Sequence, residues 1–132
     1  EAIVRKQGTD LTIVAFGRMV HEALDAAEQL KEVGLNVEVI DARSVQPFDT
    51  ATVVTSIKKT HRALIVHEAV KFGGIGGEIT AQIQEEAFDY LDAPIMRVAA
   101  PFSPVPFSPA LEKLYIPNAA GIVAKVKETL EL

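Results

Sequence analysis

The chain has 132 residues, of which 48% are hydrophobic, so it is long and apolar enough to bury the core of one domain. Its formal net charge of -5 argues against a basic surface for nucleic acid, and the lack of cysteine excludes disulfides, thiolate metal sites and cysteine nucleophiles. No apolar run reaches the roughly 20 residues of a membrane-spanning helix, and residues 1–6 lack the pattern of a signal peptide.

The first part of the sequence alternates between strand and helix patterns. The apolar, β-branched run at 11–16 predicts a strand buried on both faces, as in a covered parallel sheet. Apolar residues at helical spacing predict a helix over 19–33, and Gly34 stands where a helix terminator would lie. A second strand is predicted at 37–40.

The alternation continues to the end of the chain. Asp49 can cap a helix before a third strand at 63–66, and a fourth strand is predicted at 95–99. Asn118 can cap a closing helix with one apolar stripe. We therefore expect residues 1–132 to form one domain, a three-layer αβα sandwich with a mostly parallel sheet of about five strands.

A glycine cluster follows the third strand and leads into a further helix. Dinucleotide-binding folds hold a phosphate at such a strand-turn-helix. Starting from Gly74 and Gly76, however, the third glycine of G-x-G-x-x-G would have to be residue 79, which is Ile. We interpret Gly73, Gly74, Gly76 and Gly77 as sites of close backbone packing, within the domain or against a neighbour, rather than as a phosphate site.

The histidines offer few catalytic combinations. His21 and His61 lie beside helix ends with no acidic or histidine neighbour at ligand spacing, and we interpret them as surface residues. His67 and Glu68 end the third strand, at the edge where open α/β sheets place ligands. Either they contact a ligand or, in the favoured interpretation, they order the following loop or an interface. No catalytic or metal-binding residue is assigned.

The proline-rich stretch at 101–109 excludes regular structure. It places Phe102 and Phe107 among prolines in a chain that otherwise keeps its apolar residues inside. The two rings either form an interface or fold back over the end of the sheet, and the sequence does not distinguish these alternatives.

These segments, in this order, resemble the C-terminal domain of transketolase-like enzymes, most closely that of the beta subunit of thiamine diphosphate-dependent 2-oxo acid dehydrogenases. The resemblance covers nearly the whole chain and is carried by residues 11–20, 39–47, 67–74, 92–98, 104–107 and 116–118. Two departures, Ala42 and the pair Phe102-Ser103, leave the substrate open between pyruvate and a branched-chain 2-oxo acid.

The resemblance implies that the subunit has an upstream domain for the pyrimidine end of the cofactor, and that an alpha subunit holds the diphosphate and magnesium. The full enzyme would oxidatively decarboxylate a 2-oxo acid and pass the acyl group to a lipoyl-bearing acyltransferase core. None of the groups that position thiamine diphosphate maps onto residues 1–132, so we expect this domain alone to bind no cofactor and to be inactive. We expect a cytoplasmic protein, or a mitochondrial one in a eukaryote.

The resemblance also implies partners. Related assemblies are heterotetramers of two alpha and two beta subunits, whose beta C-terminal domains meet across a two-fold axis and receive a small basic domain of the acyltransferase. The acidic positions Glu86, Asp89 and Asp92 are the candidates for this docking, and a symmetric contact presents each of them twice.

Two other functions stay open. The chain could be a stand-alone module that holds a nucleotide or small anion around His67 and the glycines, or the C-terminal domain of transketolase or deoxyxylulose-phosphate synthase. The segments at 104–107 and 116–118 favour the dehydrogenase.

Overall fold

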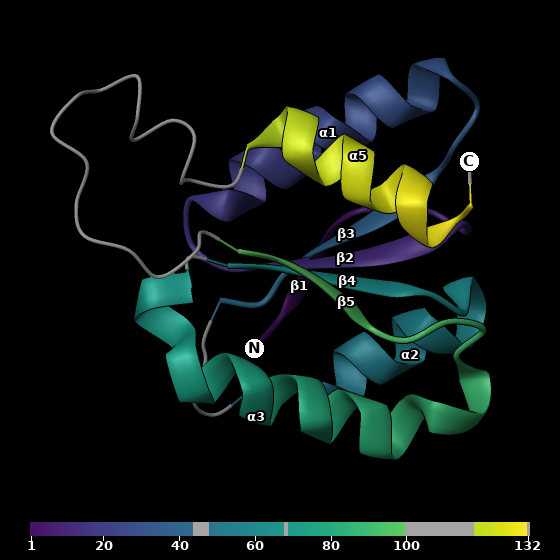
Figure 1. Ribbon diagram of the computed structural model, residues 1–132. Helices are drawn as coiled ribbons and strands as arrows, with labels where there is room; N and C mark the ends of the chain where they lie inside the picture. The colour runs from purple at the N-terminus through teal and green to yellow at the C-terminus, as the bar shows by residue number, and fades with distance from the viewer. Residues whose placement is uncertain (44–47, 68, 100–117, 132) are drawn as a thin grey trace, which may run out of the picture.

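The computed structural model describes residues 1–43, 48–67, 69–99 and 118–131. Its strands are β1 (Ile3–Lys6), β2 (Leu11–Ala15), β3 (Val37–Asp41), β4 (Ala63–His67) and β5 (Met96–Ala99). Within the described residues they form a five-stranded sheet in the order β1-β3-β2-β4-β5 (Figure 1). β2 is parallel to β3 and β4, and β4 is parallel to β5, whereas β1 is antiparallel to β3. The sheet is mostly parallel, as predicted.

Helices cover both faces of this sheet (Figure 1). On one face lie α1 (Met19–Glu32) and α5 (Ala119–Thr129), and on the other lie α2 (Thr50–Thr60) and α3 (Ala69–Ala87). A short 3-10 helix, η1 (Phe88–Tyr90), follows α3 directly. This arrangement confirms the predicted αβα sandwich. No helix in the described ranges is long and apolar enough to cross a membrane.

The central strand β2 is buried along its whole length. Because side chains alternate along a strand, Leu11 and Ile13 join the core beneath α1 and α5, while Val14 joins the core beneath α2 and α3. Burying an aliphatic side chain of this size stabilises the fold by roughly 1.5–3 kcal/mol. The continuous apolar run of the sequence thus reflects a strand that serves two cores.

The predicted helix ends are confirmed. The Asp49 carboxylate accepts a hydrogen bond of 3.1 Å from the Thr52 N–H at the start of α2. The Asn118 side chain accepts one of 2.9 Å from the Gly121 N–H at the start of α5. Gly34 follows α1 with φ +86°, a left-handed conformation that glycine adopts without strain.

The glycine cluster is not a loop. Gly73, Gly74, Gly76 and Gly77 all lie inside α3, so the expected glycine-rich turn before the helix is wrong. Each glycine in a helix interior costs about 1 kcal/mol relative to alanine. The later turns of α3 offset this cost, since its residues Ile79, Ile83 and Ala87 are buried at intervals of four.

Candidate functional site

His67 lies where the sequence predicts it, at the end of β4 and thus at the carboxyl edge of the parallel strands. His67 is buried, with 4% of its surface exposed. At the same edge, Asp41 ends β3; its carboxylate accepts a 2.9 Å hydrogen bond from the Arg43 N–H and lies 3.7 Å from the Arg5 guanidinium. Asp41 therefore stabilises a local turn and pairs with β1. Glu68 lies outside the described residues, and a role for His67 in ordering an interface stays a prediction.

Gly77 makes no close approach to the described residues of this domain. It is exposed, and a Cβ added to it would meet no described atom within 4 Å. The described residues therefore show no close packing at Gly77, and close packing against a neighbouring chain stays a prediction for it. Phe102 and Phe107 lie outside the described residues.

The acidic candidates gather where α3 ends. Glu86 lies in the last turn of α3, Asp89 in η1, and Asp92 in the turn that follows, and all three are exposed. With the exposed Glu85 they form what we call the acidic surface. The carboxyl end of a helix carries partial negative charge, so carboxylates there are locally unfavourable.

Contacts from α2 hold η1 and the turn after it. The His61 Nδ1 atom lies 2.7 Å from the Tyr90 carbonyl oxygen, and the Asp92 N–H donates to the His61 carbonyl oxygen at 2.8 Å. His61 adopts a left-handed conformation, with φ 63°, at the end of α2. The Lys58 ammonium lies 5.2 Å from the centre of the Tyr90 ring. His61 is only partly exposed, and the sequence does not reveal its hydrogen-bond partner, which is 29 residues away.

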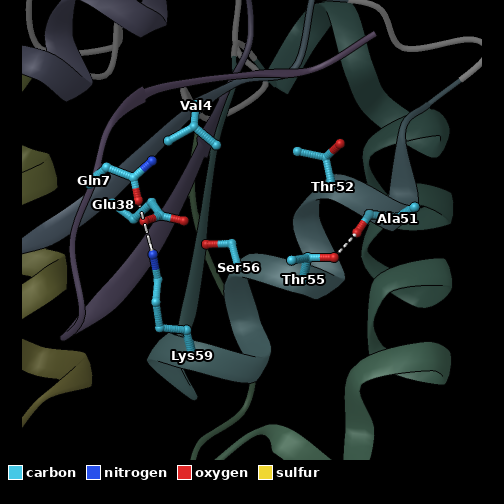
Figure 2. A pocket seen from close by; sticks show the side chains of 8 residues that line it. All are labelled: Val4, Gln7, Glu38, Ala51, Thr52, Thr55, Ser56 and Lys59. Atoms are coloured by element: carbon cyan, nitrogen blue, oxygen red, sulfur yellow. Dashed lines mark hydrogen bonds and ion pairs between the residues drawn. The ribbon is translucent and has the colours of Figure 1, made fainter.

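A pocket of about 400 Å³ lies between β1, β3 and α2, and the sequence does not predict it (Figure 2). On its inner side is Glu38, which is 2% exposed and forms an ion pair with Lys59. Gly8 donates its N–H to the same carboxylate at 3.0 Å. Lys59 also donates to the Gln7 side chain at 3.2 Å.

Glu38 is charged despite its burial. Burial by itself raises the pKa of its carboxyl group, but hydrogen bonds from Lys59, Ser56 and Gly8 outweigh this effect and hold the pKa below its ordinary value. The Thr12 hydroxyl, beside Glu38 in the sheet, lies 2.6 Å from the Ser56 and Thr60 hydroxyls. This polar network joins β2, β3 and α2, and its atoms are largely engaged with one another.

The described residues do not fit the diphosphate and magnesium of a thiamine cofactor. They contain no group of three or more His, Asp or Glu side chains arranged to hold a metal ion. From Ala69 the chain is helix through the glycine cluster, and this cluster lacks the G-x-G-x-x-G spacing. We therefore assign no residue of these ranges to that cofactor.

Comparison with known proteins identifies the class. Residues 1–122 match the model of the family described as "Transketolase, C-terminal domain", and the chain belongs to this family. Its curated relatives include the pyruvate dehydrogenase E1 component subunit beta of Staphylococcus aureus, which is 47% identical over 131 residues. The corresponding Staphylococcus epidermidis protein is 46% identical over 131 residues. The match covers 99% of this chain but 40% of each relative.

Solved structures show the same fold. A structure titled "Split gene transketolase, inactive beta4 tetramer" superposes with a TM-score of 0.76 and 32% identity, covering 100% of this chain and 43% of that one. A transketolase variant from Pichia stipitis gives a TM-score of 0.65 at 17% identity, covering 98% of this chain and 18% of that one. The fold expected from the resemblance is therefore confirmed.

Proposed function

We propose that this chain is the C-terminal domain of the beta subunit of a thiamine diphosphate-dependent 2-oxo acid dehydrogenase that acts on pyruvate. The observation that supports this most strongly is the 47% identity with a pyruvate dehydrogenase beta subunit along 99% of the chain. The enzyme oxidatively decarboxylates its substrate and passes the acyl group to lipoyl. Thiamine diphosphate and magnesium lie outside this domain, in the upstream domain and the alpha subunit.

Within that enzyme, the domain serves assembly and docking. It meets a second beta subunit across a two-fold axis, contacts the alpha subunit, and receives the basic binding domain of the lipoyl acyltransferase core. Support for docking comes from Glu86, Asp89 and Asp92, which are exposed and follow one another at the end of α3. With Glu85 they make four exposed carboxylates within positions 85–92, which raise the local negative potential and attract a cationic partner.

The proposed reaction is tested on the reconstituted enzyme. The full-length subunit is coexpressed with its alpha subunit, and decarboxylation is measured with thiamine diphosphate and magnesium. We expect pyruvate to be used with a higher kcat/KM than 3-methyl-2-oxobutanoate, a branched-chain substrate. A preference for the branched-chain acid would contradict the proposal that pyruvate is the substrate. Transfer of a ketol group between sugar phosphates would identify a transketolase instead.

A stand-alone binding module makes a different prediction. Saturable thermal stabilisation of the isolated domain by a nucleotide or by inorganic phosphate would favour that alternative, because a ligand that binds the folded state stabilises it.

A further inference from the structure

We propose that Phe88 is the apolar anchor of the acidic surface, and that the partner there is a basic segment presenting an aliphatic or aromatic side chain among its Lys and Arg residues. This inference rests on the proposed docking function and adds to it the residue that contributes most affinity. His61 acts as a positioning residue that holds the anchor from α2.

The exposure of Phe88 is the first observation. It is 65% exposed, whereas the preceding residue, Ala87, is fully buried. The buried stripe of α3 ends at Ala87, and Phe88 is the first residue of the 3-10 helix η1 that follows. Tyr90, two residues on, is 38% exposed. Two large exposed aromatic side chains this near to each other in the chain are typical of an interaction site.

The charges around this ring are the second observation. Glu85, Glu86, Asp89 and Asp92 all lie within four residues of Phe88 in the sequence, and all are exposed. The last turn of α3 contains no basic residue to balance the helix dipole. An aromatic centre with a charged rim is the arrangement of many protein interfaces, and the rim here selects a cationic partner.

The same charges argue against a second copy of this chain as the occupant. A symmetric contact through Phe88 would place the carboxylates of one copy against those of the other. Like charges facing each other across an interface are unfavourable, and more so when water is excluded. A basic partner instead relieves the repulsion among these carboxylates.

The anchor is held in place before any partner binds. Hydrogen bonds with His61 hold the Tyr90 carbonyl oxygen, in the last residue of η1, and the Asp92 N–H, two residues further on. Lys58, in the last turn of α2, lies against the Tyr90 ring, so α2 and the residue that caps it hold the turn. A turn that is already ordered loses little entropy on binding, and this strengthens the complex.

The anchor is tested with F88S in the complete enzyme of alpha and beta subunits. The probe is the isolated basic binding domain of the acyltransferase, titrated by calorimetry. We expect the Kd to rise about tenfold or more, which corresponds to the loss of one anchor side chain, with the salt dependence of binding unchanged. The matched control is V33S, since Val33 is 60% exposed at the end of α1, on the opposite face of the sheet.

Positioning by His61 is tested by rescue. H61A should weaken docking and speed dissociation, whereas H61N should restore both, because asparagine accepts the left-handed conformation and its amide can donate to the Tyr90 carbonyl oxygen. Equal docking by H61A and the unmodified enzyme would overturn the positioning role.

The outcomes separate this inference from the proposed function. If the double charge reversal E86K/D89K weakens docking and F88S does not, the anchor is wrong and the docking function stands. If neither variant weakens docking, both fail. If F88S instead dissociates the beta subunits in sedimentation experiments, the occupant is a second copy and the inference is overturned.

Discussion

At the scale of single residues, Glu38 shows how a charge is kept inside this fold. Its carboxylate is buried on the sheet and would be costly there alone. Lys59, Ser56 and the Gly8 N–H all donate to it, and together they lower its pKa. A carboxyl group whose pKa is lower in the folded state than in the unfolded state adds stability above its ordinary pKa, and this stability is lost as the pH falls through the folded value.

We therefore predict that the effect of E38Q depends on pH. At neutral pH the neutral amide cannot accept as strongly from Lys59, and we expect a loss of about 1–3 kcal/mol in the free energy of unfolding. The difference between E38Q and the unmodified domain should shrink as the pH is lowered below the ordinary glutamate value. Urea unfolding from pH 7 to pH 3 measures this, with E28Q at an exposed position of α1 as control. A difference that does not change with pH would contradict the lowered pKa.

The sequence does not reveal the roles of Glu38 and His61, and the physical reason is the same for both. Glu38 and His61 both depend on contacts with residues about 20–30 positions away, and neither residue type is typical of the role it takes. The caps Asp49 and Asn118 were predicted because each bonds a backbone N–H only three residues ahead.

At the scale of elements, the parallel strands were predictable because each is a continuous apolar run that must be covered on both faces. β1 was not among the predicted ranges. It has four residues, its burial alternates between exposed and partly buried, and its pairing with β3 depends on residues more than 30 positions away. The start of α3 was misplaced because glycine normally interrupts a helix, while the packing that sustains this helix lies further along it.

Alanine substitutions at Gly77 and Gly8 should change the stability of the domain in opposite directions. G77A should stabilise the isolated domain by about 1 kcal/mol, because alanine favours a helix and the added Cβ meets no described atom. G8A should destabilise it, because its Cβ would clash with the backbone of Val37 and Glu38. Thermal unfolding of the two variants compares them directly.

The G77A variant also tests whether another chain packs against α3. If G77A is stable alone but fails to assemble with the alpha subunit, the prediction that Gly77 packs against another chain gains support. Destabilisation of the isolated domain by G77A would contradict the open surroundings of this residue.

At the scale of the whole molecule, the acidic surface of Glu85, Glu86, Asp89 and Asp92 lies at the carboxyl end of α3 and in the residues that follow it. Charge attraction across such a surface is screened by salt over about 10 Å at 0.1 M. Docking of the acyltransferase binding domain should therefore weaken about tenfold or more between about 0.05 and 0.5 M salt.

The control for this prediction uses acidic residues of α1, on the opposite face of the sheet. E86K/D89K should weaken docking and flatten its salt dependence, whereas E28K/E32K, at exposed positions of α1, should leave both unchanged. An affinity that is constant between low and high salt would remove the acidic surface from the docking function.

The antiparallel strand at the edge of the sheet has a further consequence for solubility. β3 pairs with β2 on one side and with β1 on the other, so this largely buried, valine- and isoleucine-rich strand is not an open edge. β1 itself is short, has an irregular register between Val4 and Lys6, and places two cations, Arg5 and Lys6, along its length. Charges and bulges of this kind prevent strands of different molecules from adding to one another. The four residues of β1 thus protect the β3 side of the parallel sheet from edge-to-edge association with other molecules.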